Sequence, residues 1–424
     1  MRMKIKLNNS GWIVLGLLFL MGLGISVTTI TDTYIQQGDG RKLTPLSTCT
    51  VSKDGYGDYT TITGCLNSLT SGGVIYVKEG NYTGETFPLV INSSVKLIGS
   101  GINKTIIFMP SNTNTHAFQN RVYSLGLGAG NYNDYIELSG FTIDANGDQQ
   151  GSTNHGGIAF YGVRNSIIKD IEIKNTYGRP FGMNTVNSDN TYNLTNNLIE
   201  HIIITRTNTT STQDAMALSG LVDSTIKDIT ITNRRGSGLT TASMKRVHIS
   251  NVRITSDNTA ITGRGLSFED YGDPDVEDVY VEDVTTNNFG ATAFYFQRAN
   301  NITCVNCKVY NVSSASDGFY IATNNSVYYN LQVYGTQGTA LDIKANADNN
   351  RFIGGEIQGA TTFSDLGTNN FFINLKSGSS YINKFLGTTR PTATEGNCYW
   401  NNTASYHCLQ CYNSTDWICG TDRV

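Results

Sequence analysis

A short pattern of apolar positions recurs along the chain from residue 138 onward. Each copy has an apolar residue, two other residues, a second apolar residue, one polar residue and a third apolar residue. The copies read LSGFTI at 138, IKDIEI at 168, IEHIII at 199, IKDITI at 226, ISNVRI at 249, VEDVYV at 276, CVNCKV at 304, YYNLQV at 328 and FIGGEI at 352. Their uneven spacing indicates a repeat with insertions of varying length.

A second apolar strand precedes most copies, as GIAF at 157, AMAL at 215, GLTT at 238, GLSF at 265, AFYF at 293, GFYI at 318 and ALDI at 340. In several repeats its first inward residue lies about ten positions before that of the repeat, which indicates two strands at a fixed offset. Each unit is too short for a βαβ crossover and has no helical period. The sequence therefore predicts an all-β fold, a single-stranded right-handed parallel β-helix or solenoid, whose handedness follows the general bias of parallel crossovers.

Composition supports strands joined by tight turns. Only 15% of the residues are charged, and the chain has 44 Gly and 6 Pro alongside many Asn, Ser and Thr. Residues such as Asn175, Asn233 and Asn311 are expected to form side-chain ladders or left-handed turns rather than catalytic sites. The net charge of −4, without a basic run after the first six residues, argues against nucleic acid as a partner.

The N-terminus predicts export. Arg2, Lys4 and Lys6 precede the uncharged, mostly apolar stretch Trp12–Ile30, which as a helix would span about 28 Å of membrane. Residues 1–34 are interpreted as a cleaved signal peptide or as an uncleaved signal anchor with the N-terminus inside, and residues 35–49 as a linker. Either alternative places the remainder on a cell or virion surface, membrane-anchored or secreted, where N-x-S/T sequons permit glycosylation.

Cysteine usage agrees with an exported chain. The eight Cys are an even number, which is typical of disulfides outside the cytoplasm. In the repeat, Cys304 and Cys307 take inward positions and are expected to be small core residues, with a bond between them the less favoured alternative because it needs a bent strand. The terminal four, Cys398, Cys408, Cys411 and Cys419, are interpreted as disulfide-bonded, with zinc as the alternative.

Residues 54–107 contain the segments Gly72 to Val77, Gly80 to Tyr82 and Leu97 to Gly101, read as GGVIYV, GNY and LIGSG. This order resembles the opening coil of the pectin lyase-like superfamily, which includes pectinesterases and polygalacturonases. The resemblance implies a short capping helix and a β-helix over residues 50–375, and it says little about chemistry. Residues 376–424 form a separate Cys-rich module that resembles the ends of viral tail fibre and tailspike proteins, with a disulfide-stapled cap as the alternative.

The residue two positions before the first inward residue of each second strand, here called the ladder position, points outward and is the candidate for chemistry. This gives Gly156, Phe181, Asp214, Ser237, Arg264, Thr292, Asp317 and Thr339. The resemblance to polygalacturonases implies Asp, Asp and His on three consecutive rungs, and here only the middle one is retained, as Asp214. A hydrolase needs a second carboxylate. The loops offer Asp144, Glu269 and His155, the last expected to be exposed in a Gly-rich loop.

An acidic sugar could be held by four further candidates, Tyr177, Arg179, Arg235 and Arg264. No metal or other cofactor is expected. Calcium on the acidic run at residues 270–275 is an alternative that nothing else in the sequence supports.

Two hypotheses for function remain. The first is an extracytoplasmic surface protein that recognises, and in its enzymatic form cleaves, a polysaccharide through a β-helix groove, as a hydrolase or lyase centred on Asp214. The second is a non-catalytic spike, adhesin or envelope protein. The missing ladder partners favour recognition over catalysis, and the sequence is compatible with a homotrimer.

Overall fold

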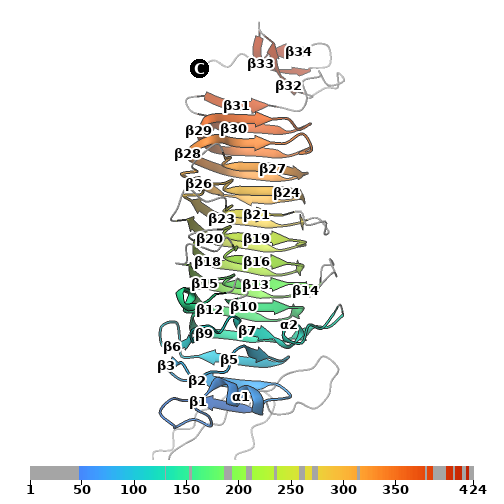
Figure 1. The fold of residues 1–424 in the computed structure, drawn as a ribbon. Coiled ribbons are helices and arrows are strands. Elements are labelled where there is room, and N and C mark those ends of the chain that lie inside the picture. The colour runs from blue at the N-terminus through green and yellow to red at the C-terminus, as the bar shows by residue number, and fades with distance from the viewer. Residues whose placement is uncertain are drawn as a thin grey trace, which may run out of the picture. The chain divides into compact units, whose positions relative to one another are not determined.

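The computed structural model describes residues 47–128, 130–151, 155–185, 193–206, 213–233, 236–256, 263–269, 276–312, 316–377, 380–384, 398–403, 406–412 and 417–419. Within these ranges, parallel strands stack coil upon coil from Thr48 to Ser377 (Figure 1). The predicted all-β fold of long parallel sheets is confirmed. No helix of the described ranges is long and apolar enough to cross a membrane, and the stretch Trp12–Ile30 lies outside them.

Two columns of strands run along the stack. Column A carries the repeat pattern and consists of β1 (Thr48–Val51), β2 (Gly73–Val77), β5 (Val95–Gly99), β9 (Glu137–Asp144), β12 (Ile167–Lys174), β15 (Leu198–Arg206), β18 (Thr225–Asn233), β20 (His248–Ser256), β23 (Tyr280–Asn287), β25 (Thr303–Val305), β26 (Lys308–Tyr310) and β30 (Phe371–Ser377), with β3 (Gly80–Tyr82) and β6 (Thr105–Phe108) extending its first coils. The antiparallel strand β31 (Ser380–Lys384) follows β30.

Column B carries the second strand of each repeat. It consists of β4 (Leu89–Ile91), β7 (His116–Asn120), β10 (Gly156–Tyr161), β13 (Phe181–Asn184), β16 (Met216–Ser219), β19 (Leu239–Ala242), β21 (Leu266–Phe268), β24 (Phe294–Asn300) and β27 (Phe319–Asn324). The long strand β28 (Val327–Ile343) pairs with column A through β25 and β26 and with column B through β27. The strand β29 (Arg351–Asp365) pairs with β28 along both parts and with β30.

Short strands and helices complete the described elements. The short strands are β8 (Asn133–Asp134), β11 (Val163–Arg164), β14 (Leu194–Thr195), β17 (Leu221–Val222) and β22 (Val276–Glu277), and the helices are α1 (Ile62–Ser68), α2 (Arg121–Ser124) and the 3-10 helix η1 (Gly147–Gln149). A separate antiparallel sheet contains β32 (Cys398–Thr403), β33 (Tyr406–Tyr412) and β34 (Trp417–Cys419). Pairing of the terminal four Cys and the identity of this module stay predictions.

The repeat pattern exists because, from β9 onward, column A bends at one residue on each coil. Between the first two inward residues a residue takes positive φ, for example Asp170 at 54°, Asn251 at 49° and Asn306 at 54°. Asn and Asp tolerate this left-handed conformation better than other non-Gly residues. Their side chains also bond from coil to coil, as Asn306 Nδ2 does to Asp283 Oδ1 at 3.0 Å. The expected turn ladders are confirmed at Asn175 and Asn311, while the side chain of Asn233 lies outside the described set.

The same bend corrects the expectation for the Cys304 pair. Both residues are fully buried, as the inward positions predict, but they form a disulfide across the bend at Asn306, with their Cα atoms 6.2 Å apart. A straight strand would point residues three apart to opposite faces. Since every coil already bends here, the bond needs no further distortion.

One copy of the repeat was placed wrongly. The copy of the repeat that pairs with Ile249 and Val252 begins at Val281 of β23, not at Val276, because VED occurs twice in succession. Val276 lies instead in the short strand β22, which pairs with Ala299. A third short strand per coil, which the pattern of two strands did not include, accounts for the difference.

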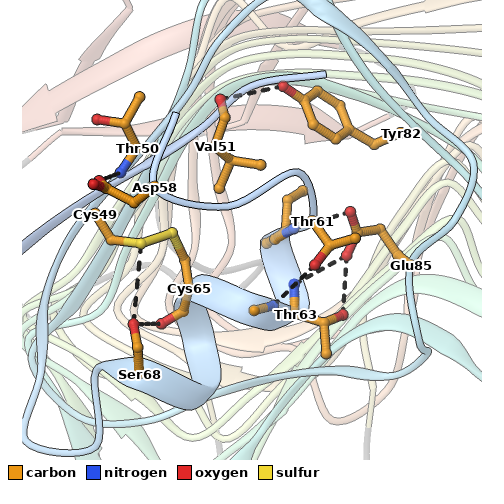
Figure 2. Close-up of a disulfide and its surroundings, with 12 residues drawn as sticks. Cys49, Thr50, Val51, Asp58, Thr61, Thr63, Cys65, Ser68, Tyr82 and Glu85 are labelled. Carbon is orange, nitrogen blue, oxygen red and sulfur yellow. Dashed lines mark hydrogen bonds between the residues drawn. A yellow bond between two sulfur atoms is a disulfide. The ribbon is translucent and has the colours of Figure 1, made fainter. Parts of the chain in front are cut away.

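At the N-terminal end, α1 packs on the first coil and is tied to it in two ways (Figure 2). A disulfide joins Cys49 of β1 to Cys65 of α1. The carboxylate of Glu85 accepts hydrogen bonds from the backbone N–H groups of Ile62 and Thr63, both at 2.9 Å, at the start of the helix. The capping helix implied by the resemblance is therefore present.

Candidate functional site

The outward side chains of column B hold the candidate site, and the strand register determines which residues share a ladder. Phe181 pairs with Ile158 on one side and with Met216 on the other. Phe181 is therefore the first inward residue of β13, and it is fully buried. The assignment of Phe181 to the ladder is wrong by two residues, and Arg179 takes that position.

A signal for the correct register is present in the sequence. The residue just before each first inward position is small or Pro, namely Gly157, Pro180, Ala215, Gly238, Gly265, Ala293, Gly318 and Ala340. A Cβ on Gly157 would lie 2.6 Å from Ile173 Cγ2, and one on Gly238 would lie 2.2 Å from Ile254 Cγ2. The chain turns here against column A, so large side chains are excluded.

The corrected ladder begins one coil earlier than expected. His116 of β7 pairs with Gly156, which places His116, Gly156, Arg179 and Asp214 on four successive coils. Sequence reasoning missed His116 because its strand, HAFQN, precedes the first copy of the repeat. The only sequence signal for His116 is its position two residues before Phe118, the first inward residue of β7.

A hollow of about 160 Å³ opens beside this ladder. It is lined by His116, Tyr123, Ile158, Ala159, Tyr161, Arg179, Gly182, Asn184 and Gln213. Its exposed surface is mostly polar, with the rings of Tyr123 and Tyr161 among the lining. Of the residues predicted from sequence, Arg179 lines the hollow and Asp214 lies next to it.

Arg179 is only loosely bound by its neighbours. Its Nη2 lies 3.5 Å from Gln213 Oε1 and 3.8 Å from Asp214 Oδ2. Its Nε is enclosed and has no hydrogen-bond partner among the described residues. A guanidinium with unused donors favours binding of a carboxylate or another planar anion.

Asp214 is held where its charge is disfavoured. Burial raises the pKa of the Asp214 carboxyl above its ordinary value, and it outweighs the opposing effects of Arg179, Ser237 and Thr240. The side chain is 21% exposed. A carboxyl in this setting can act as a proton donor at a higher pH than a free Asp.

Two histidines lie close to Arg179, and the structure corrects the expectation for one of them. His155 is fully buried rather than exposed, and neither ring nitrogen has a hydrogen-bond partner in the described part of the chain. Burial lowers the pKa of His155 to about 4. Burial, followed by the charges of His155 and Arg179, lowers the pKa of His116 to about 4 as well. Both imidazoles are therefore neutral near pH 7.

Aromatic side chains also line the hollow. The ring of Tyr123, from α2, meets His116 edge-on at 5.8 Å and Tyr161 at 4.5 Å between centroids. Burial raises the pKa of Tyr123, so its phenol keeps its proton at neutral pH. Neither phenol oxygen bonds to another described residue, and the wall therefore offers two free hydroxyl groups.

A strip of small side chains leads away from the hollow along column B. It consists of Ala159, Gly182, Ala217 and Thr240, on four successive coils. On the next coil Ser267 of β21 pairs with Thr240 and is fully buried. Beside β21, Arg264 forms an ion pair with Glu269 and lies 3.5 Å over the ring of Tyr295. Arg264 and Glu269 thus bind each other at the end of the strip.

The other predicted residues do not converge on Asp214. Asp144 accepts a hydrogen bond from Asn175 at 3.0 Å in a turn ladder of column A and does not line the hollow. Tyr177 is half-buried in the turn before β13, also away from the lining. Arg235 and the acidic run at 270–275 lie outside the described residues. Among the residues that the structure describes, no cluster of metal-binding side chains occurs.

A second ionisable cluster lies beyond Tyr295. Burial, and then the charge of Asp342, raise the pKa of Asp317. Lys344 donates a hydrogen bond to Asp342 and lies 4.6 Å over the ring of Tyr320, which stacks on Tyr295 at 4.5 Å. The charged groups Lys344 and Asp342 therefore pair with each other, whereas Arg179 Nε beside the hollow has no hydrogen-bond partner among the described residues.

Comparison with solved structures supports the parallel β-helix fold. The chain is similar to PfbA, a surface adhesin of Streptococcus pneumoniae, at 14% identity and a TM-score of 0.52 over 83% of this chain and 95% of that one. It is similar to the A-module of the Azotobacter vinelandii mannuronan C-5 epimerase AlgE4, at 15% identity and a TM-score of 0.53 over 78% and 94% of the two chains.

A further similar structure is ORF18 of Geobacillus virus E2, with 14% identity and a TM-score of 0.46. The match covers 84% of this chain and 64% of that protein, so this chain spans less than two thirds of its length. No family model and no curated protein sequence matches the chain. At these identities the likeness establishes the fold and leaves the chemistry to the site itself.

Proposed function

We propose that this chain is an exported carbohydrate-binding protein that recognises a segment of an acidic polysaccharide on the outward face of column B. The observation that carries the proposal is Arg179, a guanidinium with unused donors that lines a hollow walled by aromatic rings. Aromatic faces and Arg are the usual groups that bind sugar rings and their carboxylates.

Three further observations support this proposal. The strip from Ala159 to Thr240 aligns small, buried side chains on successive coils, and their small size favours close approach of a linear ligand to the strands. Two disulfides in the described residues fit an oxidising compartment outside the cytoplasm. The fold is shared with a surface adhesin and with an enzyme named for its action on mannuronan. A location on a cell or virion surface, anchored or secreted, is part of the same proposal.

Binding of acidic and neutral oligosaccharides to the full-length chain tests the proposal by calorimetry. Arg179→Gln removes the cation but keeps a polar side chain, and we expect about 10- to 100-fold weaker binding of the acidic ligand. Arg246→Gln is the matched control, because Arg246 is exposed and pairs with Asp223 away from the hollow. Equal affinities of the two variants, or no binding of any acidic glycan, would contradict the proposal.

A further inference from the structure

The outward row of column B that contains the strip continues past the hollow toward the N-terminal coils. Ala159 pairs with Gln119 of β7, and Gln119 pairs with Val90 of β4. Val90 lines a second groove, of about 550 Å³. Residues of α2 and its C-cap line the same groove, namely Arg121, Ser124 and Leu125. Because Tyr123 of α2 lines the hollow, this helix separates two depressions that share one row of outward residues.

Between the hollow and the second groove, the row is covered. Gln119 is only 8% exposed, although it occupies the same outward row as Ala159. The ring of Tyr123 meets His116 on one side of this row and Tyr161 on the other, with centroids 5.8 and 4.5 Å away. A ring that makes both contacts lies across the row. A linear ligand on the strip is therefore stopped between Ala159 and Gln119.

Buried hydrogen bonds hold α2 in this position. Asn120, the N-cap of α2, is fully buried, and its Oδ1 accepts hydrogen bonds from the backbone N–H groups of Tyr123 at 3.4 Å and Tyr161 at 2.9 Å. Its Nδ2 donates to the Tyr161 carbonyl at 2.6 Å and to Asn133 Oδ1 at 2.9 Å. Asn133 Oδ1 also accepts a hydrogen bond from the Val122 N–H at 3.2 Å. Since moving α2 would leave these buried groups without partners, the helix is a fixed wall.

The hollow beside this wall has the size of a site for one sugar residue. Its volume of about 160 Å³ lies below the roughly 300–1,000 Å³ of clefts that enclose a drug-sized ligand. Arg179, whose Nε is enclosed without a partner among the described residues, lines the hollow itself. The sugar whose carboxylate binds Arg179 is therefore the one next to α2, and the other sugars extend along the strip away from this helix.

We propose that the hollow receives the terminal residue of an acidic glycan, so that this chain recognises chain ends whose last sugar carries a carboxylate. A residue inside a glycan chain has a neighbour on each side, and α2 excludes one of these neighbours. This inference rests on the proposed function and deepens it, because it names the part of the polysaccharide that binds.

Trisaccharides of galacturonate, mannuronate or glucuronate test this inference when two of their three carboxylates are methyl esters. The free carboxylate then lies at the non-reducing end, in the middle or at the reducing end, while the sugar and its linkages stay the same. Calorimetry with the full-length chain should show one terminal isomer binding about 10- to 100-fold more tightly than the middle isomer, because only a terminal carboxylate reaches Arg179. The fully esterified trisaccharide is the ligand control.

Two variants test whether α2 is the wall. Tyr123→Ala opens the row toward Gln119, and we expect it to reduce the preference for the terminal isomer to a few fold by strengthening binding of the middle isomer. Leu125→Ala is the matched control, because Leu125 is 57% exposed and lines the second groove. This control should keep the wild-type preference.

The outcomes separate the two proposals. A middle isomer that binds the wild type as tightly as the terminal isomers would overturn end recognition and keep the proposed function. A full preference for the terminal isomer in Tyr123→Ala would overturn the assignment of α2 as the wall. Failure of the wild type to bind any of the three trisaccharides with all carboxylates free would instead overturn the proposed function. The comparison of isomers on the wild type does not depend on the folding of either variant.

Discussion

The two buried histidines near Arg179 should make stability depend on pH. Both have folded-state pKa values of about 4, against 6.5 for a free imidazole, because burial disfavours the charged form. Between these values the unfolded chain binds more protons than the folded one, so stability falls as the pH decreases from about 6.5 to 4. Each histidine accounts for at most about 3 kcal/mol of this loss.

Urea unfolding at a series of pH values checks this expectation. The variant His155→Gln should lose less stability than the wild type on acidification, since it has one buried imidazole fewer. His248→Gln, which changes a half-exposed histidine, should follow the wild-type curve. A His155→Gln curve parallel to that of the wild type would show that His155 does not titrate as a buried group.

The sequence predicts some of the individual site residues and not others. The sequence predicts both Asp214 and Arg179 as site residues. It assigns Phe181 instead of Arg179 to the ladder, because Phe181 is taken as an outward residue. Only the pairing of Phe181 with Ile158 and Met216 corrects this. The environment of His155 depends on the packing of a Gly-rich turn, and neither pattern nor propensity describes such packing.

Among the helices and strands, α1 shows how a terminal element is attached. The carboxylate of Glu85 is 7% exposed and accepts two backbone hydrogen bonds at the start of the helix (Figure 2). In Glu85→Ala these donors lose their partner, and we expect the amides of Ile62 and Thr63 to exchange with solvent roughly 30-fold faster. Glu79→Ala, at an exposed turn, should leave exchange of these amides unchanged, and equal rates in both variants would contradict the capping role.

The left-handed bend at Asn306 predicts that a Gly substitution there is less destabilising than an Ala substitution. This residue has φ of 54° and bonds to Asp283 and Asn330 on the neighbouring coils at 3.0 and 2.8 Å. Gly adopts this conformation without strain, whereas Ala costs about 1 kcal/mol more. Thermal unfolding should therefore rank Asn306→Gly above Asn306→Ala, although both lose the ladder bonds.

Lys308 provides the opposite control. It lies two residues further in the extended strand β26, where Gly is less favourable than Ala. Lys308→Ala should therefore be more stable than Lys308→Gly. The same order at both positions would show that the left-handed bend at Asn306 does not determine its sequence.

The element pattern was largely readable because column A repeats its bend on every coil. The sequence assigns the repeat to the first of two VED motifs, at 276, and this is wrong. The second motif, at 281, has the same local pattern, so the two differ only in the coil with which they pair. Pairing with Ile249 selects Val281, and this is information about distant parts of the chain. Local periodicity therefore predicts the existence of strands better than their register.

For the whole molecule, the low charge of the chain has a structural explanation. Many polar contacts between coils are made by Asn side chains, which bond to one another or to Asp, and stacked rings such as Phe294 and Phe319, 4.6 Å apart, fill the interior. Each coil contacts mainly its two neighbours, so a site on a solenoid is a ladder of residues rather than a loop cluster. Several of the buried side-chain groups without a hydrogen-bond partner among the described residues lie near Arg179, in His116, His155 and Arg179 itself.

The length of the strip predicts how affinity should vary with ligand length. Four coils from Ala159 to Thr240 cover about 14 Å between the first and last strand, a length that about three linked pyranoses can occupy. Beyond Thr240, the ion pair of Arg264 and Glu269 and the ring of Tyr295 occupy the face.

Calorimetry with acidic oligosaccharides should show affinity that rises up to about the trisaccharide and then levels off. Arg264→Ala, which removes this barrier, should extend the rise to longer ligands, and a wild-type affinity already maximal for a monosaccharide would restrict recognition to the hollow.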